Sequence, residues 1–274
     1  MRFPSPLPKG IMRRDEEPMP PFVTEAVILH TAELGERDRL VVLYGDERGK
    51  MRGVAKGAAA SRKRFGANLD LLAHVRIHGF EKLHQGLVRV EGADLLEHFG
   101  GLRTQLQAFA RGCYLSEWMD GCTAERQPLP GLQSLLLVVL RALEAGKGGE
   151  GLIRIFEMKL LDLAGYGPKL DRCVACGDDL GNEGRVRVQV ERGGALCRVC
   201  AAGRSQGLRI SMGTLRALQD ARGLDLRRLH RMALSLEAVE ESRSLMRAFY
   251  GFHVGRPLRS TTLLEKLERG TLAP

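Results

Sequence analysis

The pattern of apolar and polar positions divides the chain into a strand-like first part and a helix-like second part. Between Phe22 and His98, short apolar runs alternate with polar residues and are separated by glycine-containing turns. Such runs predict β-strands, here over residues 23–31, 39–44, 50–55, 69–80 and 86–95. Five short strands within roughly 75 residues predict a small closed barrel. An OB-fold fits the count, although the pattern alone leaves an SH3-like barrel open.

Beyond residue 98 the apolar positions recur with the period of an α-helix. This period predicts helices around residues 102–119, over 132–143 and over 152–163, with breaks at two prolines and at a glycine-rich stretch. Two further helices are predicted over 212–218 and 224–247. The predicted fold class is therefore α+β, an N-terminal five-stranded OB-fold barrel followed by an α-helical domain.

Proline content marks the start of the chain as a separate segment. Residues 1–21 carry six prolines among mixed charges and few apolar groups, which predicts a flexible tail. The predicted organisation is a tail at 1–21, an OB-fold domain at 22–98 and a helical domain at 99–274. The helical domain includes a small cysteine-bearing hairpin at 171–202.

Four cysteines in the second domain form two C-x2-C pairs separated by twenty residues: Cys173 with Cys176, and Cys197 with Cys200. Each pair suits a tight knuckle, and the alternating valines of 186–190 with the Gly193-Gly194 turn predict a hairpin that folds one pair onto the other. Four thiolates fill a tetrahedral Zn²⁺ site and leave no open position, so we predict a structural zinc. Two C-x-x-C redox centres are the competing interpretation, which the glycine- and proline-bearing surroundings disfavour. The other two cysteines, Cys113 and Cys122, are predicted to be buried and reduced.

Charge indicates the class of partner. Lys and Arg number 42 against 33 Asp and Glu, for a net charge of +9 and a pI near 9.5, so a polyanion is the expected ligand. The segment between Arg48 and Leu69 has no acidic residue, which predicts a DNA-binding surface, although a solvated basic loop is the alternative. The predicted contacts on the barrel are the basic residues of this segment and two arginines that precede it: Arg37, Arg39, Arg48, Lys50, Arg52, Lys56, Arg62, Lys63 and Arg64. A second basic patch, for which solubility is an equal explanation, comprises Arg222, Arg227, Arg228 and Arg231.

Aromatic residues are scarce in the predicted barrel: only Phe22, Tyr44, Phe65 and Phe80 are present, and at least two should be core. Binders of single strands usually offer several stacking aromatics. Recognition by the barrel is therefore expected to rest on the phosphate backbone, without sequence preference, and to accept single- or double-stranded DNA.

Motifs of several enzyme classes are missing from the sequence. It contains no G-x-x-x-x-G-K-[ST], H-E-x-x-H or G-x-S-x-G, and we expect a protein that is not an enzyme. No apolar run approaches the roughly 18 residues of a membrane span, and the N-terminus lacks the apolar core of a signal peptide. We therefore expect a cytoplasmic, nucleoid-associated location and no membrane partner.

Short motifs in a fixed order resemble the bacterial DNA repair proteins of the RecO family. They read TEAVILHT (24–31), LGERDRL (34–40), GKMRGVAKG (49–57), SRKRFG (61–66), YLSE (114–117), FEMKLL (156–161), GYGP (165–168) and LRS (258–260). The resemblance implies a recombination mediator that binds DNA, anneals complementary strands without ATP and, with RecR, helps load RecA onto DNA coated by single-stranded DNA-binding protein (SSB). It also implies contact with the acidic C-terminal tail of SSB, for which a groove between helices and Arg141 are candidates.

The mechanism expected from these properties is electrostatic. A basic surface that holds two complementary strands lowers their phosphate repulsion and raises their local concentration. Two other functions stay open at this stage. A generic OB and zinc-ribbon module, perhaps directed to RNA, would bind without annealing, and a thiol-disulfide enzyme would reduce a test disulfide without holding metal.

Overall fold

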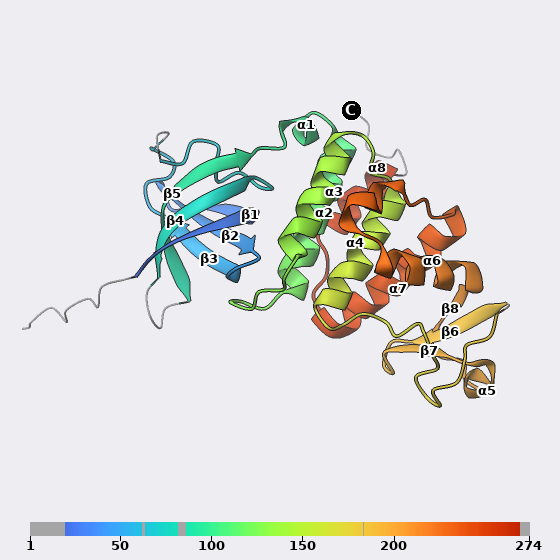
Figure 1. The fold of residues 1–274 in the computed structure, drawn as a ribbon. Helices are drawn as coiled ribbons and strands as arrows, with labels where there is room; N and C mark the ends of the chain where they lie inside the picture. The colour runs from blue at the N-terminus through green and yellow to red at the C-terminus, as the bar shows by residue number, and fades with distance from the viewer. Residues whose placement is uncertain (1–19, 62–63, 82–85, 183, 269–274) are drawn as a thin grey trace, which may run out of the picture.

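The computed structural model describes residues 20–61, 64–81, 86–182 and 184–268. Figure 1 shows the barrel at one end of the molecule, a small sheet at the other end, and helices between them. No helix in the described ranges is both long enough and apolar enough to cross a bilayer.

The barrel is a closed five-stranded sheet. Its strands are β1 (Pro21–Leu34), β2 (Asp38–Gly45), β3 (Gly49–Ala55), β4 (His74–Glu81) and β5 (Leu87–Glu97), in the order β1-β2-β3-β5-β4 with β1 closing on β4. All neighbours are antiparallel except β3 and β5, which are parallel. The predicted five-stranded barrel of OB type is thus confirmed.

The fourth strand begins five residues later than its predicted start at residue 69. Residues 69–73 form turns instead, with Leu72 at a φ of 69°. Leu69 packs into the barrel core, whereas Leu72 packs into the core of the helical domain. These two apolar residues lie in a turn and are buried in different cores. Their apolar pattern resembles that of a strand, which is why the sequence predicts one there.

The barrel and the helices share a continuous apolar interface. On β1, Ala26 and Ile28 face the barrel interior, while Val27 and Leu29 join the helical core, so both faces of the strand are buried there. The hydroxyl of Tyr44 donates to the carbonyl of Leu129 and accepts from its N–H, at 3.2 and 2.8 Å. The barrel is therefore held rigidly against the helices.

Helices α1 (Gly100–Arg103), α2 (Leu106–Cys122), α3 (Leu132–Glu144) and α4 (Glu150–Leu163) follow the barrel, as the apolar period predicts. The remaining helices are α5 (Arg198–Ala201), α6 (Met212–Gly223), the 3₁₀ helix η1 (Leu226–Arg231), α7 (Leu236–Val254) and α8 (Ser260–Glu268). Trp118, Leu136, Phe156 and Phe249, from four of these helices, are fully buried in one core. Cys122 is buried in this core, as predicted, and Cys113 is half-buried; both are free thiols.

The single helix predicted over 224–247 is wrong, because the chain is interrupted in the middle of that range. Ser235 is the N-cap of α7, and its Oγ accepts the N–H of Ala238 at 3.1 Å. This cap starts a new helix at Leu236 and leaves the short η1 before it. Helix α7 then continues to Val254, where Gly255 adopts the left-handed conformation that ends it.

The small sheet has the order β7-β6-β8, with β6 at Arg185–Gln189, β7 at Gly194–Leu196 and β8 at Leu208–Ser211. The predicted hairpin is confirmed as β6 and β7, and the third strand lies beyond its predicted end at residue 202. Val186, Val188 and Ala195 are buried in the same core as the helices. The apolar side of this insert therefore packs on the helical domain.

Candidate functional site

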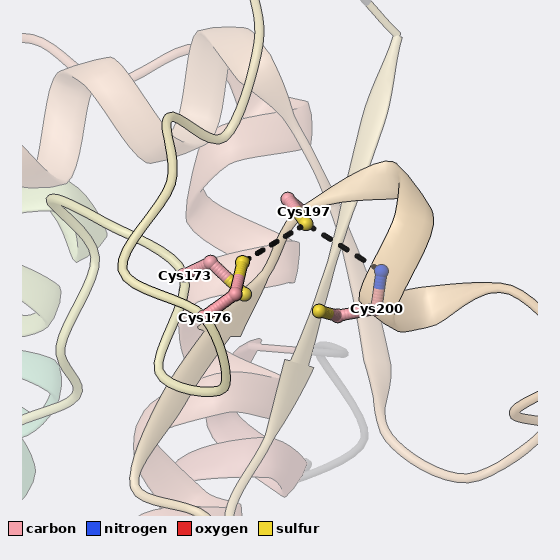
Figure 2. A group of neighbouring side chains, drawn as sticks. All are labelled: Cys173, Cys176, Cys197 and Cys200. Atoms are coloured by element: carbon pink, nitrogen blue, oxygen red, sulfur yellow. Dashed lines mark hydrogen bonds between the residues drawn. The ribbon is translucent and has the colours of Figure 1, made fainter.

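The four cysteines of the C-x2-C pairs converge at the edge of the small sheet. Cys173 and Cys176 lie on a loop closed by hydrogen bonds from Cys173 N to Asp178 O and from Gly177 N to Cys173 O, both 2.9 Å. Cys197 follows β7 and caps α5, and Cys200 lies within α5. Figure 2 shows the four side chains pointing toward one another from these two segments.

The geometry of this cluster fits a tetrahedral metal site. All four Sγ atoms lie within 4.8 Å of one another, and Cys176 Sγ is 3.7 Å from Cys197 Sγ. A zinc–sulfur bond of about 2.3 Å in a tetrahedron places neighbouring sulfurs about 3.8 Å apart. A disulfide needs about 2.05 Å, so the four thiols are arranged as ligands and not as bonded pairs. The cluster can hold a metal ion.

Backbone N–H groups favour a thiolate at Cys173, whereas hydrogen bonds with neighbouring sulfurs raise the pKa of Cys176 and Cys200. Burial disfavours the ionised form of Cys173, but hydrogen bonds from backbone amides, that of Cys197 among them, outweigh it and lower the pKa of Cys173 to about 6. Cys200 N lies 3.5 Å from Cys197 Sγ in the second knuckle. A metal ion binds the deprotonated sulfur, so these amides also stabilise the ligand form.

The cysteine element is attached firmly to α7. Glu241 accepts hydrogen bonds from Ser211 N at 2.8 Å and Thr214 Oγ1 at 2.5 Å, and it also pairs with Arg185 of β6. These bonds lower the pKa of Glu241 although burial opposes the shift. The cysteine cluster therefore sits on a rigid part of the helical domain.

The basic run of the barrel is divided by the fold. Lys50 is 4% exposed, and its Nζ lies 2.5 Å from the carbonyl oxygen and 3.0 Å from Oδ1 of Asp120 in α2. Gly49, at a φ of +66°, lets the chain approach the backbone of Gln127 so closely that a Cβ would lie 2.5 Å from it. Lys50 is thus an interface residue between barrel and helices and is removed from the proposed DNA surface.

Other predicted contacts on the barrel have acidic partners from distant parts of the chain. Arg48 pairs with Glu81 at 3.0 Å and lies over the Phe22 ring at 4.6 Å. Arg52 pairs with Glu125 at 2.7 Å, and Arg39 lies 3.7 Å from Asp70. The local excess of positive charge between Arg48 and Leu69 is therefore partly neutralised in space. Glu81 and Glu125 lie far from this run along the chain and Asp70 directly follows it, so a charge count confined to the run contains none of these acids.

Three of the predicted barrel contacts remain exposed: Arg37, Lys56 and Arg64. Their loops are held together, since Ala59 N donates to Arg37 O at 3.1 Å and Arg64 Nη2 donates to Lys56 O at 3.2 Å. Arg64 also lies 3.9 Å from Glu91. Arg62 and Lys63 fall outside the described residues.

The second predicted patch does not form one described surface. Arg222 holds Asp162 through two bonds of 2.7 and 2.8 Å and donates to the carbonyl of Pro168 at 2.8 Å, so it joins α6 to the end of α4. Arg228 is exposed on η1. The side chains of Arg227 and Arg231 lie outside the part of the chain that the structure describes.

Arg141, a candidate for the SSB tail, instead joins α3 to the barrel. Its guanidinium contacts both oxygens of Glu97 at distances from 2.6 to 3.1 Å. These hydrogen bonds raise the pKa of Arg141. Its positive charge is therefore already paired with the carboxylate of Glu97.

Comparisons with known proteins agree with this architecture. Residues 19–99 match the family model described as "Recombination protein O N terminal", and residues 103–262 match "Recombination protein O C terminal". A protein of Anaeromyxobacter sp. (strain K) named "DNA repair protein RecO" is 35% identical over 241 residues, covering 88% of this chain and 94% of the relative. Proteins of the same name from Desulforamulus reducens and Symbiobacterium thermophilum are 30% and 32% identical, covering 92% and 90% of this chain and 96% and 97% of their own lengths.

Proposed function

The chain belongs to the RecO family of DNA repair proteins, and from this premise we propose that it is a recombination mediator. It binds DNA and anneals complementary single strands without ATP. With RecR, it helps load RecA onto single-stranded DNA that is coated by SSB. We place this activity in the cytoplasm at the nucleoid, and we assign DNA binding to a domain at 22–98 and partner contacts to a domain at 99–274.

The observation that carries the proposal is the group of three exposed cations, Arg37, Lys56 and Arg64, on the OB-type barrel. Arg37, Lys56 and Arg64 are exposed on segments that hydrogen bond to one another, so these segments are held close together. Each phosphate that such a cation neutralises releases condensed counterions, which favours binding of any sequence. Two strands held on one basic surface repel each other less, and annealing then requires no nucleotide hydrolysis.

We propose that the ion held by the four cysteines is structural Zn²⁺. Cysteine sulfurs occupy all four tetrahedral positions, which leaves none for water or substrate. The ion would fix the two knuckles and, through β6 and β8, the orientation of the small sheet on α6 and α7.

An apolar pocket between α3, α4 and η1 supports a site for the SSB tail. It has a volume of about 280 Å³ and is lined by Leu135, Leu163 and Leu226, with Lys159 and Arg222 among its polar groups. Lys159 Nζ donates to the carbonyls of Arg222 and Leu224, each at 3.0 Å, and burial lowers its pKa. An acidic tail with an apolar end would place its side chains on the leucines and its carboxylates toward Lys159, since Arg222 is already paired with Asp162 in the same pocket.

ATP-free annealing of complementary oligonucleotides coated with SSB, measured across a salt series, tests the proposed function. We expect annealing above the spontaneous rate at low salt and a steep loss as salt rises, because the binding is electrostatic. Annealing of bare strands but not of coated strands would contradict the mediator assignment and leave a generic nucleic-acid-binding module. An equal or stronger preference for RNA would point to the RNA-directed alternative.

A further inference from the structure

The helical domain carries the exposed aromatic group that the barrel lacks. At the C-terminal end of α7, the His253 ring stacks on Tyr166 with centroids 4.8 Å apart and planes 13° apart. Phe252 meets the same His253 ring edge-on at 5.1 Å. We name these three residues the aromatic shelf.

Phe252 is unusual among the exposed apolar side chains. It is 56% exposed and is the single aromatic among the large apolar residues that are exposed in the described ranges. The four aromatics of the barrel offer no comparable ring: Phe22, Tyr44 and Phe65 are buried, and Phe80 is half-buried. An exposed ring beside a stacked pair presents a flat face to which a nucleobase can bind.

The shelf leads directly into a groove between the two domains. This groove has a volume of about 640 Å³ and is lined by His30 and Thr31 of β1, Tyr250 of α7, and Arg256 and Arg259 of the segment that follows α7. His253 follows Tyr250 by three residues and so lies on the same face of α7, and Gly255 in the left-handed conformation turns the chain so that Arg256 follows at the groove wall. Shelf and groove are therefore contiguous.

The arginines that line the groove are exposed, whereas the carboxylates that line it already bind other groups of the protein. Arg256 and Arg259 are both exposed, and among the described residues neither guanidinium pairs with a carboxylate. Glu117, on the opposite wall, accepts Arg259 N at 2.7 Å, Ser260 N at 2.9 Å and Ser260 Oγ at 2.5 Å. Asp120 is paired with Lys50 at 3.0 Å. The carboxylates thus fix the protein segment, and the arginines remain for an anionic ligand.

Thr31 adds a polar group without a protein partner. Its Oγ1 is buried and has no hydrogen bond in the structure, although the residue lines the groove. A hydroxyl in this state is satisfied when a ligand or an ordered water enters.

Strand β1 leads from the groove toward the exposed cations of the barrel. Leu71 lines the groove, and its neighbour Asp70 contacts Arg39 of β2 at 3.7 Å. From Thr31, strand β1 runs to the turn that carries Arg37, whose carbonyl is bonded to the 57–61 loop.

We infer that the aromatic shelf and the groove beside it form a binding track for single-stranded nucleic acid. Bases stack on the shelf at Phe252 and His253, and backbone phosphates pair with Arg256 and Arg259 in the groove. The inference rests on the proposed DNA-binding function and deepens it, because it gives the helical domain a contact that a duplex cannot make with its bases paired and stacked. It predicts a preference for single strands that originates outside the barrel.

Substitution of the exposed ring tests the stacking contact. Phe252→Ala should weaken binding of a fluorescein-labelled oligothymidylate about tenfold in a fluorescence anisotropy titration, because stacking on one aromatic side chain contributes this order of affinity. Phe252→Tyr should retain the affinity, since a ring remains. Leu236→Ala, which removes a side chain that is 88% exposed elsewhere on α7, is the matched control and should bind as the unsubstituted protein does.

The salt dependence separates stacking from charge. Phe252→Ala should leave the salt slope unchanged, whereas Arg256→Glu should flatten it, and Lys147→Glu at the exposed turn after α3 should alter binding less than Arg256→Glu. For the unsubstituted protein, an oligomer of the same charge built from abasic sugar phosphates should bind about as weakly as oligothymidylate binds to Phe252→Ala.

The outcomes distinguish the track from the proposed function. Tight binding of oligothymidylate by both the unsubstituted protein and Phe252→Ala would overturn the track and leave DNA binding by the barrel intact. Absence of binding by the unsubstituted protein would contradict the proposed function itself. Photocrosslinking with iododeoxyuridine in the oligomer should attach to the peptide that contains Phe252 or to the one that contains Tyr166, and attachment only to barrel peptides would also overturn the track.

Discussion

The cysteine element and the basic run of the barrel are both visible as short patterns in the sequence, but the fold treats them differently. The four cysteines converge to within 4.8 Å, as their spacing predicts. The basic run instead separates: Lys50 is buried against Asp120, Arg48 and Arg52 meet distant acids, and Lys56 stays exposed. Ligands of one ion must face one another, so their spacing constrains their geometry. Charges along a strand face whatever the rest of the chain places opposite them.

The largest expected effect comes from removal of a cysteine ligand. Cys173→Ser should abolish stoichiometric zinc and unfold residues 171–202, since metal binding at such sites contributes about 10 kcal/mol or more of apparent folding free energy. Metal content by mass spectrometry and amide hydrogen exchange of the small sheet measure the two effects. Cys113→Ser, outside the cluster, is the control and should keep the zinc. A native exchange pattern in metal-free Cys173→Ser would show that the ion is not structural.

A smaller effect is expected at Arg222, which the sequence groups with the basic patch and the fold places in an ion pair. Arg222→Ala should lower the free energy of unfolding by about 1–2 kcal/mol, because it removes charge-assisted bonds to Asp162 and a bond to Pro168 from a site that is partly exposed. Arg228→Ala should leave stability unchanged. Urea denaturation of the two variants makes the comparison, and equal stabilities would mean that the Arg222 clamp contributes nothing.

The smallest expected effect is the pH dependence of the interface at His74. Burial lowers the pKa of His74, which lies 3.2 Å from Gln133 Nε2 of α3. The His74 imidazole therefore binds a proton less readily in the folded protein than in the unfolded chain. The contribution of neutral His74 to the free energy of unfolding is therefore complete above its ordinary pKa of 6.5. This contribution is lost as pH falls through the lower pKa that His74 has in the folded protein. Denaturation on both sides of pH 6.5 should show a larger loss on acidification for the unsubstituted protein than for His74→Gln, and identical losses would exclude His74 as the cause.

The sequence was sufficient for the barrel because its strands alternate in the usual way, with Phe22 and Thr24 buried between exposed Pro21, Val23 and Glu25. It was insufficient at residue 69 and at Ser235, where an apolar turn and a helix cap interrupt otherwise regular patterns.

The candidate DNA surface was the part least accessible to pattern analysis. Burial of Lys50 depends on Asp120, which lies 70 positions away, and on the glycine that lets Gln127 approach the barrel. No local window contains these residues together. The sequence did not predict the aromatic shelf for the same reason. Tyr166 and His253 stack because the ends of α4 and α7 lie side by side.

A comparison of Lys50→Met with Lys56→Met tests most directly the claim that the fold divides the basic run into structural and DNA-facing cations. DNA binding across a salt series and urea denaturation are measured for both variants. We predict that Lys56→Met reduces the salt slope by about 0.7–0.9 for one lost phosphate contact and leaves the free energy of unfolding unchanged. We predict that Lys50→Met lowers the free energy of unfolding by about 1–2 kcal/mol and leaves the salt slope unchanged. A reduced salt slope in Lys50→Met, with no loss of stability, would contradict the account.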